Sequence, residues 1–414
     1  MTTDQPNIRA AATGDWDAIA DLLWLLFHGG PDQEQRAAAG ELWEAGRALV
    51  AVDGVDIVGH ASAFTRAMAV PGGVVPAAHV TQVGVAPTHR RRGILRALMQ
   101  RQLGAVQAVG VEPFAVLWAS EGRIYPRFGY GPAASRLNLR IDTRETDLQT
   151  SWRRPGERHG RLRMVTPPDA LAELRRVFDV VQPTRPGWST RSPQMWNYLL
   201  TDSESSRDGA TERRAALVEG PGGPTGFALW RTKEGWDDDS PAAEVRIDSV
   251  IAVDPASYAE LWRFLLGIDL ARVASFAMAA EDEPLRLMVA EPARLRARVG
   301  EALWVRLVDV GAALAARRYA VDVDVVIEVE DELLPANAGR WRLRGGPDGA
   351  GCDRTGAPAD VVCDIRTLGA AFLGGPTLAR LADAGQGGSS DAGALTRASL
   401  AFAGTRAPSA CEIF

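Results

Sequence analysis

A cluster of arginines lies in the stretch VTQVGVAPTHRRRGILRALM, residues 80 to 99. The stretch begins with alternating apolar residues, passes a proline and ends in an apolar run with helical spacing. Arg90, Arg91 and Arg92 therefore fall between an expected strand and an expected helix, beside Gly93. Backbone N–H groups at such a junction lack partners within the helix, and the helix dipole adds positive charge. The pattern predicts a seat for a phosphate-bearing cofactor; a solvated basic loop is the alternative.

The whole chain has the composition of a globular protein of two or three domains, with 414 residues and 46% hydrophobic residues. Its net charge of −6 argues against a main role in binding nucleic acid, which needs a concentrated basic surface. We expect neither a signal peptide nor a membrane span, because the apolar run near the start is short and acidic. The three cysteines have no CxxC spacing, which favours reduced thiols in a cytoplasmic protein without a zinc site.

The arginine cluster must be positioned by the elements around it. The first 145 residues predict a mixed sheet with helices on both sides, in the order β-α-β-β-β-α-β-α-β. Strands are expected at 7–12, 76–86, 113–120 and 134–141, and a hairpin at 48–65, in which the strands ALVAV and VDIVGHASAF are joined by the turn Asp53-Gly54. A helix capped at Thr13 or Asp15 is expected to run through Trp16 to Phe27, a second helix is expected at 94–109, and a helical turn at Tyr125.

The rest of the chain is less regular. Residues 144 to 161 are polar and predict a linker, and 201–215 and 232–240 predict exposed loops. Near Leu303 a strand, a helix and another strand are expected to begin a compact α+β unit that continues to the C terminus.

A possible internal repeat links two stretches. Residues 250 to 266, VIAVDPASYAELWRFLL, have the same outline of strand, proline and helix as residues 83 to 99. The second stretch lacks the arginines and the glycine. It predicts a second copy of the same fold over residues 160 to 295 without the cofactor seat, although any strand–proline–helix unit has this outline.

The arginine stretch resembles the acetyl-CoA loop of the GNAT acetyltransferases, whose pattern is R/Q-x-x-G-x-G/A. Arg90-x-x-Gly93 fits, and Leu95 departs from the small residue expected at the end. HRRRGILR together with ASEGRIYPRFGYG, residues 119 to 131, resembles one branch, the Eis family of N-acetyltransferases. The resemblance implies a mixed α/β and α+β fold of two GNAT domains, the second degenerate, and a sterol-carrier-like domain, over residues 1–145, 146–295 and 296–414.

The resemblance also implies acetyl-CoA as co-substrate and no metal. A strand edge would bond the pantetheine arm, the loop would wrap the pyrophosphate, and the segment after the next strand would line the cleft, which opens where two parallel strands separate after residue 85. The residues implied are Val83, Gly84, Val85, Arg90, Arg91, Arg92, Gly93, Ile94, Leu95, Arg96, Ser120 and Glu121.

Two catalytic groups follow from the same resemblance. Tyr125, in YPRFGY, would protonate the coenzyme sulfur, because a phenol with a pKa of about 10 keeps its proton at neutral pH. Tyr130 is the nearby competitor, at a position usually filled by a core phenylalanine. The α-carboxylate of Phe414 would act as base, often through water. In the family the residue before the last is often acidic. Here Ile413 stands at that position and the acid, Glu412, comes one residue earlier, so the sequence leaves open whether this acid binds polyamines.

The acceptor wall is expected in the segment after the first strand. Its aromatic and acidic residues would suit a polycationic sugar, although helical spacing also fits a core position. They are Trp24, Phe27, His28, Asp32, Glu34 and Trp43.

We therefore predict a cytoplasmic, homohexameric N-acetyltransferase. It would acetylate primary amines of aminoglycoside-like small molecules by direct transfer in a ternary complex, with neither nucleic acid nor membrane as a partner. Two alternatives are open. One is an acetyltransferase for protein lysines or small polyamines, and the other is a non-catalytic acyl-CoA- or lipid-binding protein.

Overall fold

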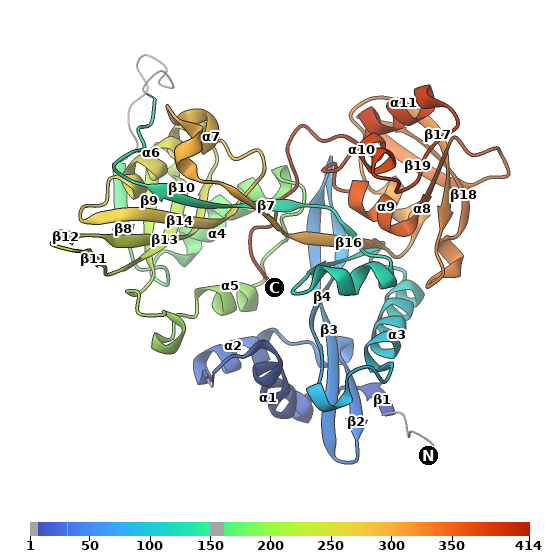
Figure 1. Cartoon of the computed structure of the whole chain (residues 1–414), viewed down its shortest axis with the longest axis horizontal. Coiled ribbons are helices and arrows are strands. Elements are labelled where there is room, and N and C mark those ends of the chain that lie inside the picture. Colours follow the sequence, from blue (N-terminus) through green and yellow to red (C-terminus); the bar gives the residue numbers. More distant parts are fainter. Residues whose placement is uncertain (1–6, 31, 150–160) are drawn as a thin grey trace.

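The computed structural model describes residues 7–30, 32–149 and 161–414 (Figure 1). The chain forms three lobes that correspond to successive thirds of the sequence. The first lies at the bottom of Figure 1, the second at the left and the third at the upper right. The C terminus lies among the three, close to the long strands β3 and β4.

The first lobe is a mixed sheet with the strand order β1-β2-β3-β4-β5-β16-β6. Only β4 and β5 pair in parallel. Helices α1 and α2 connect β1 to β2, and α3 connects β4 to β5. The bounds are β1 Asn7–Ala10, α1 Trp16–Phe27, α2 Gln33–Leu42, β2 Leu49–Asp53, β3 Asp56–Val70, β4 Gly73–Val85, α3 Ile94–Val109, β5 Phe114–Trp118, β6 Gly131–Pro132 and β16 Leu303–Leu307.

The second lobe repeats this arrangement, with the order β8-β9-β10-β13-β14-β7-β15 and a parallel pair β13–β14 joined through α6. The expected internal repeat is therefore present. The bounds are β7 Ser135–Asp142, β8 Arg161–Val165, α4 Leu171–Val181, α5 Pro193–Leu200, β9 Arg214–Gly220, β10 Gly223–Lys233, β13 Ala243–Ala252, α6 Pro255–Leu266, β14 Ala271–Ala279, α7 Leu285–Met288 and β15 Arg298–Glu301.

The two sheets exchange strands, which the sequence analysis did not predict. β7, expected to complete the first sheet, pairs with β14 of the second. β16, expected to open the third unit, pairs with β5 of the first. Both expectations were wrong because an alternating apolar pattern predicts a strand without saying which sheet edge it will cover. The predicted domain boundaries themselves stay a prediction.

The third lobe packs helices on a sheet with the order β19-β18-β17-β20. Trp341 lies on β18, and Val361 begins β20. The bounds are α8 Val310–Ala315, β17 Val323–Glu330, β18 Gly339–Gly346, β19 Gly349–Arg354, β20 Val361–Asp364, α9 Ile365–Ala371, α10 Leu378–Asp383 and α11 Ala392–Phe402.

Several smaller expectations need correction. Helix α2 was missed because its sequence, QEQRAAAGEL, carries only a narrow apolar stripe, with Ala38 and Leu42 buried. Residues 232–240 contain a short hairpin of β11 Trp236–Asp237 and β12 Ser240–Pro241. The expected linker lies partly outside the described residues, but the N–H of Gln149 donates to the carbonyl of Met288 at 2.8 Å, so its first part packs on the second lobe.

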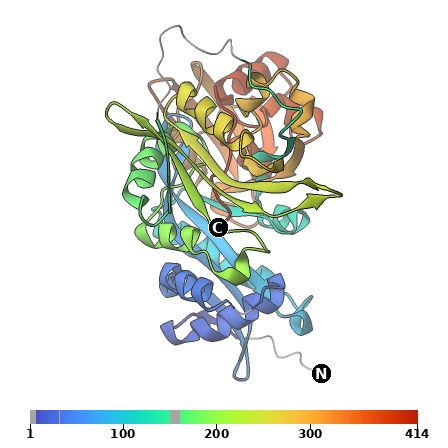
Figure 2. The same cartoon turned by 90° about the vertical axis from the view of Figure 1, so that its left-hand side faces the viewer.

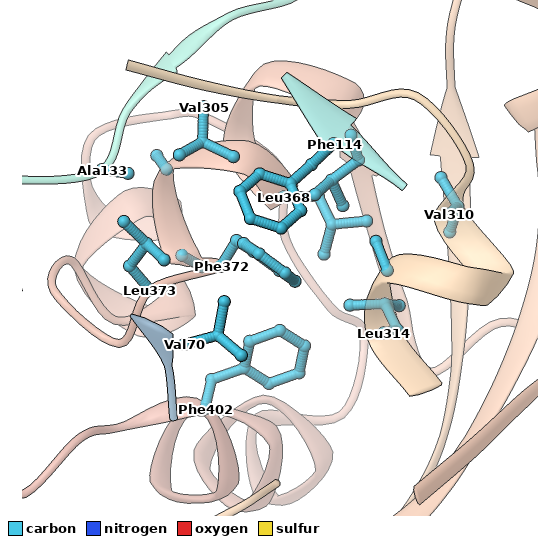
Figure 3. Close-up of a cluster of buried hydrophobic side chains, with 14 of the residues drawn as sticks. Val70, Phe114, Ala133, Val305, Val310, Leu314, Leu368, Phe372, Leu373 and Phe402 are labelled. Atoms are coloured by element: carbon cyan, nitrogen blue, oxygen red, sulfur yellow. The ribbon is translucent and has the colours of Figure 1, made fainter. Parts of the chain in front are cut away.

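One hydrophobic core is shared by the first and third lobes (Figure 3). Val70 of β3 and Phe114 of β5 lie beside side chains of the third lobe, and the rings of Phe114 and Phe372 are 4.9 Å apart. Phe402 of α11 packs into the same cluster. Because all four side chains are buried, neither lobe can move from the other without exposing this core.

A buried ion pair adds to this junction. Nη2 of Arg306, on β16, donates to both carboxylate oxygens of Asp331, which follows β17, at 2.8 Å. The two side chains are 0% and 1% exposed. Asp331 also accepts hydrogen bonds from the backbone of Leu333 and Leu334.

No helix among the described residues is long and apolar enough to cross a membrane. No three metal-ligating side chains gather in that part of the chain either.

Replacing Asp331 by Asn should cost about 3–5 kcal/mol of unfolding free energy, because the guanidinium of Arg306 would stay buried without a counter-charge. The matched control is Asp324→Asn, which removes a half-exposed partner of Arg342 and should be nearly neutral. Urea unfolding followed by tryptophan fluorescence measures both variants. Equal stability of the two would contradict the importance of the buried pair.

Candidate active site

The site begins where the parallel strands β4 and β5 separate. They pair from Ala77 and Phe114 to Val80 and Leu117 and no further. Beyond Val80, β4 continues to Val85 bonded only to β3 on its other side. The backbone edge of 81–85 that faces away from β3 is therefore open within the described chain. The opening lies five residues before the position predicted from the sequence, which was residue 85.

A β-bulge causes the early separation. Gln82 has a left-handed φ of 54°, and the register of β4 against β3 shifts between His60 and Ser62. Such an extra residue bends and twists the strand away from its neighbour. Two side chains of β3 hold the bulge in place. Nδ1 of His60 lies 2.8 Å from the carbonyl oxygen of Gln82, and the Ser62 hydroxyl donates to the side-chain oxygen of Gln82 at 3.0 Å.

The arginine loop follows directly from the end of β4. Arg90, Arg91, Arg92 and Arg96 are exposed, and within the described chain none of them forms an ion pair or a side-chain hydrogen bond. Arg91 and Gly93 both have left-handed φ values, 64° and 81°. Alternation of left-handed and right-handed residues turns successive N–H groups to one side and forms an anion-binding concavity.

Helix α3 starts at Ile94 with no side chain capping its first turn in the described structure. The equivalent helix of the second lobe, α6, is capped by Asp254, whose carboxylate accepts from the N–H of Ser257 at 2.8 Å. A capping carboxylate occupies the place that an anion would take. At this strand–helix junction the first lobe therefore offers an open helix N terminus, whereas the equivalent junction of the degenerate second lobe does not.

The apolar residues of the loop pack inward. Ile94 is buried in a cluster that includes Leu98, and Leu95 packs against the cluster around Tyr125 and Phe128. Leu95, the departure from the GNAT pattern, thus packs on the core. Gly84 permits close packing of α1, because a Cβ there would lie 2.3 Å from Cδ1 of Leu26.

Tyr125 lies on a helical turn, η4 Gly122–Phe128, just after β5. Its ring is 7% exposed and lines a cavity, together with Ser120. Burial, helped by Glu121, raises the pKa of Tyr125 to about 12, so the hydroxyl keeps its proton. Tyr130 is fully buried outside this cavity, and its hydroxyl has no partner in the described structure. Glu121 is exposed and does not line the cavity.

The C terminus reaches the same cavity, which Ile413 and Phe414 line. The Phe414 ring packs edge-on against His79, with centroids 4.9 Å apart. In both views the terminus lies close to α5 of the second lobe (Figure 1, Figure 2). The end of the chain is therefore packed on the first and second lobes.

Glu412 anchors this end. Its buried carboxylate pairs with Arg66 of β3 and with Arg191, whose Nη2 donates at 2.7 Å. Burial alone would raise the pKa of Glu412, but Arg191 and Arg66 outweigh it and lower the pKa to about 2. The sequence left open whether Glu412 binds polyamines. In the structure its carboxylate is bonded to two arginines and is therefore not available to an amine.

The cavity has a volume of about 390 Å³ and lies between α1, α2, β4, α5 and the C terminus. Of the predicted acceptor wall, Trp24 and Phe27 line it. Trp43 is buried in a separate cluster with Ile19, and the carboxylate of Asp32 caps α2 by accepting from the N–H of Gln35. His28 and Glu34 are exposed outside the cavity.

Other lining residues were not predicted. Trp16 and Arg36 come from α1 and α2, Trp118 from the end of β5, and Tyr198 from α5 of the second lobe. Trp16 could have been found from its helical spacing to Trp24. Tyr198 carries no signal in the sequence, because its place depends on how the lobes pack.

Glu412→Gln should release the C terminus, because two guanidinium groups would lose their buried counter-charge at a cost of about 3–5 kcal/mol. Hydrogen exchange of the C-terminal peptide should show at least a tenfold loss of protection at neutral pH. With a pKa lowered to about 2, the wild-type anchor is complete above the ordinary value of 4.5 and weakens as the pH falls toward 2. Glu332→Gln, at an exposed carboxylate, is the control. Unchanged protection in Glu412→Gln would show that the ion pairs do not hold the tail.

Comparison with known proteins agrees with this architecture. The GNAT acetyltransferase domain matches residues 7–133, a second GNAT domain matches 187–307, and a sterol carrier protein domain matches 310–410. An uncharacterized N-acetyltransferase of Streptomyces avermitilis is 42% identical over 99% of this chain and 98% of its own length. N-acetyltransferase Eis of Mycobacterium bovis is 33% identical over 94% of each chain.

A solved structure has the same fold throughout. Eis1 from Mycobacterium abscessus superimposes with a TM-score of 0.85 at 33% identity, covering 99% of this chain and all of the other. The predicted fold class, two GNAT domains followed by a sterol-carrier-like domain, is thus confirmed. The GNAT domains make the chain an acyltransferase that uses an acyl-CoA and an amine-bearing acceptor. From its relatives, its fold and its domain order together, the chain belongs to the Eis family of GNAT N-acetyltransferases.

Proposed function

We propose that this enzyme transfers the acetyl group of acetyl-CoA to a primary amine of a small molecule, by direct attack in a ternary complex. The observation that carries the proposal is the meeting of Tyr125 and Phe414 in one cavity. A phenol that keeps its proton and the carboxylate of the chain end are a suitable acid and base for this reaction. Aminoglycoside-like amines are the acceptor class that the family resemblance implies.

The residues around the open strand edge fit acetyl-CoA. The free backbone edge at 83–85 can pair with the pantetheine amide groups as an added strand would. The unpaired arginines 90–92 and 96 and the uncapped N–H groups of 93–96 suit the charge of the pyrophosphate. Ser120 would face the acyl end from the cavity wall, and Glu121, the next residue, is exposed outside the cavity. The thioester supplies the activated carbonyl.

The chain's own groups then move the protons. The carboxylate of Phe414 accepts a proton from the attacking ammonium, directly or through water. As the nitrogen lone pair forms the C–N bond and the C–S bond breaks, Tyr125 donates its proton to the departing sulfur. The nitrogen then loses its second proton to the same carboxylate or to water, which leaves the amide and the free thiol. Of the two protons removed from the ammonium, solvent returns one to the phenol and takes up the other. No acyl-enzyme is needed for this direct transfer.

The alternatives differ in their acceptors. Protein lysines and small polyamines carry the same nucleophile and stay open as substrates. The non-catalytic acyl-CoA- or lipid-binding protein is set aside by the family assignment, which makes the chain an enzyme. From the resemblance we also propose a cytoplasmic homohexamer, for which light scattering should give six times the chain mass of 44.3 kDa.

Thiol release from acetyl-CoA with kanamycin, spermidine and a lysine peptide tests the function. At least one amine should give release and an N-acetylated product by mass spectrometry. Two glycines added after Phe414 should lower the rate at least tenfold, because they move the carboxylate out of the cavity. The same two residues added before Met1 are the control. No release with any amine would refute the proposed function, and full activity of the extended chain would refute the role of the carboxylate.

Tyr125→Phe should lower kcat roughly 10²–10⁴-fold if the phenol is the general acid. Acetyl-CoA affinity, measured by calorimetry, should stay within threefold. The chain provides a matched control in Tyr130→Phe, which removes an unpartnered hydroxyl outside the cavity and should keep turnover near the wild-type value. If Tyr125→Phe turned over like Tyr130→Phe, the assignment of the acid would be wrong.

A further inference from the structure

The side chains around the cavity carry information about the acceptor. We propose that the preferred acceptor is an arylalkylamine, a molecule with one ammonium group on a short chain and a flat apolar body. This inference rests on the proposed function and narrows its substrate class away from the polycationic sugars implied by the family resemblance.

The walls are rich in aromatic side chains. Trp16, Trp24 and Phe27 come from α1, Trp118 from β5 and Tyr198 from α5. Phe27 is 52% exposed at the edge of this cavity. An aromatic body can stack on such walls and bury apolar surface, whereas a sugar ring carrying several ammonium groups would find no aspartate or glutamate among the described lining residues.

The charge around the cavity is unsuited to a polycation. Among the lining side chains that the structure describes, Arg36 carries charge and none is an aspartate or glutamate. Arg36 is held in place by Asp17 and Asp21, each at 2.7 Å, and its guanidinium lies 4.9 Å from the centre of the Trp24 ring. Both carboxylates are mostly exposed and already bonded to this arginine, so they lie outside the wall that an acceptor would touch.

A neighbouring cavity leads to the same conclusion. It shares Gln35 and Tyr198 with the first, so an acceptor longer than the first cavity would extend into it. Its lining includes four arginines and a single acidic side chain, Asp248, in the described chain. Nε of Arg213 already donates to Asp248 at 2.6 Å. The other three arginines are paired as well, Arg207 and Arg231 with Asp202, and Arg246 with Asp208 and Glu244. Additional ammonium groups of a polyamine would thus have to compete with these arginines for carboxylates that are already bonded.

The count of charges decides between the two acceptor classes. Phe414 lines the cavity, and in the proposed function its α-carboxylate pairs with one ammonium, the one that reacts. Aromatic faces can assist this cation, and each further ammonium would be desolvated beside Arg36 without a partner. One ammonium on an apolar body is therefore the acceptor that these walls can satisfy.

Steady-state acetylation of five probes by the full-length enzyme tests the proposal. The probes are 2-phenylethylamine, tryptamine, kanamycin, spermidine and a lysine peptide. We expect kcat/KM for the two aromatic monoamines to exceed that of every other probe at least tenfold. A higher kcat/KM for kanamycin, spermidine or the peptide would overturn the inference while leaving the acetyltransferase intact. Failure of all five would instead refute the proposed function.

Variants of Arg36 add a second test of the charge argument. Arg36→Glu should raise the kcat/KM of kanamycin relative to 2-phenylethylamine at least tenfold, because it puts a carboxylate in the wall. Arg36→Gln removes the positive charge alone and should give a smaller rise of the same ratio. It provides the test if the reversed charge of Arg36→Glu disturbs the contact between α1 and α2. A ratio that does not change in the folded Arg36→Gln enzyme would contradict the charge argument.

Discussion

The buried carboxylate of Glu412 is the contact on which the site depends. It joins Arg66 of the first lobe, Arg191 of the second and the end of the third lobe's chain. The residues before Arg191 support it, since the backbone of 187–190 bonds to β3 at Ala67 and Ala69. A charge buried in this way is stable only while both arginines stay in place. The position of the next two residues, Ile413 and Phe414, follows from it.

The degenerate second lobe contributes to this contact and to the cavity. Its helix α6 is capped by Asp254 and has no open N terminus, so it offers no seat equivalent to the arginine loop. It supplies Arg191 for the anchor and Tyr198 for the cavity wall instead. The exchange of β7 and β16 makes the lobes interdependent, because the first sheet is complete only when residues 303–307 are in place. The shared core around Phe114 and Phe372 also makes the first and third lobes depend on each other.

The local elements of the first lobe could largely be predicted from the sequence. Helix α3 spans 94–109 as its apolar spacing indicated, and the hairpin turns at Gly54, whose φ is 61°. The arginine loop lies between strand and helix as its composition indicated. These features depend on residues close together in the chain, for which periodicity and turn chemistry are informative.

Features that depend on distant residues could not be predicted in this way. The separation of β4 and β5 occurs at Val80 because of a bulge at Gln82, which is held by His60, 22 residues earlier in the sequence. The role of Glu412 depends on two arginines far away in the chain. Trp43 comes from the segment expected to form the acceptor wall but is a core residue, whereas Trp16, with the same chemistry, lines the cavity. Residue type alone therefore does not distinguish a core tryptophan from one that lines the cavity.

We propose that the phenol of Tyr125 and the carboxylate of Phe414 act on opposite sides of one reacting group. A crystal structure of the enzyme with coenzyme A and an amine acceptor tests it most directly. We predict the pyrophosphate on the N–H groups of 91–96, the sulfur within hydrogen-bond reach of the Tyr125 hydroxyl, and the amine nitrogen bonded to the Phe414 carboxylate directly or through one water. A sulfur remote from Tyr125, or an amine bound away from the chain end, would contradict the account.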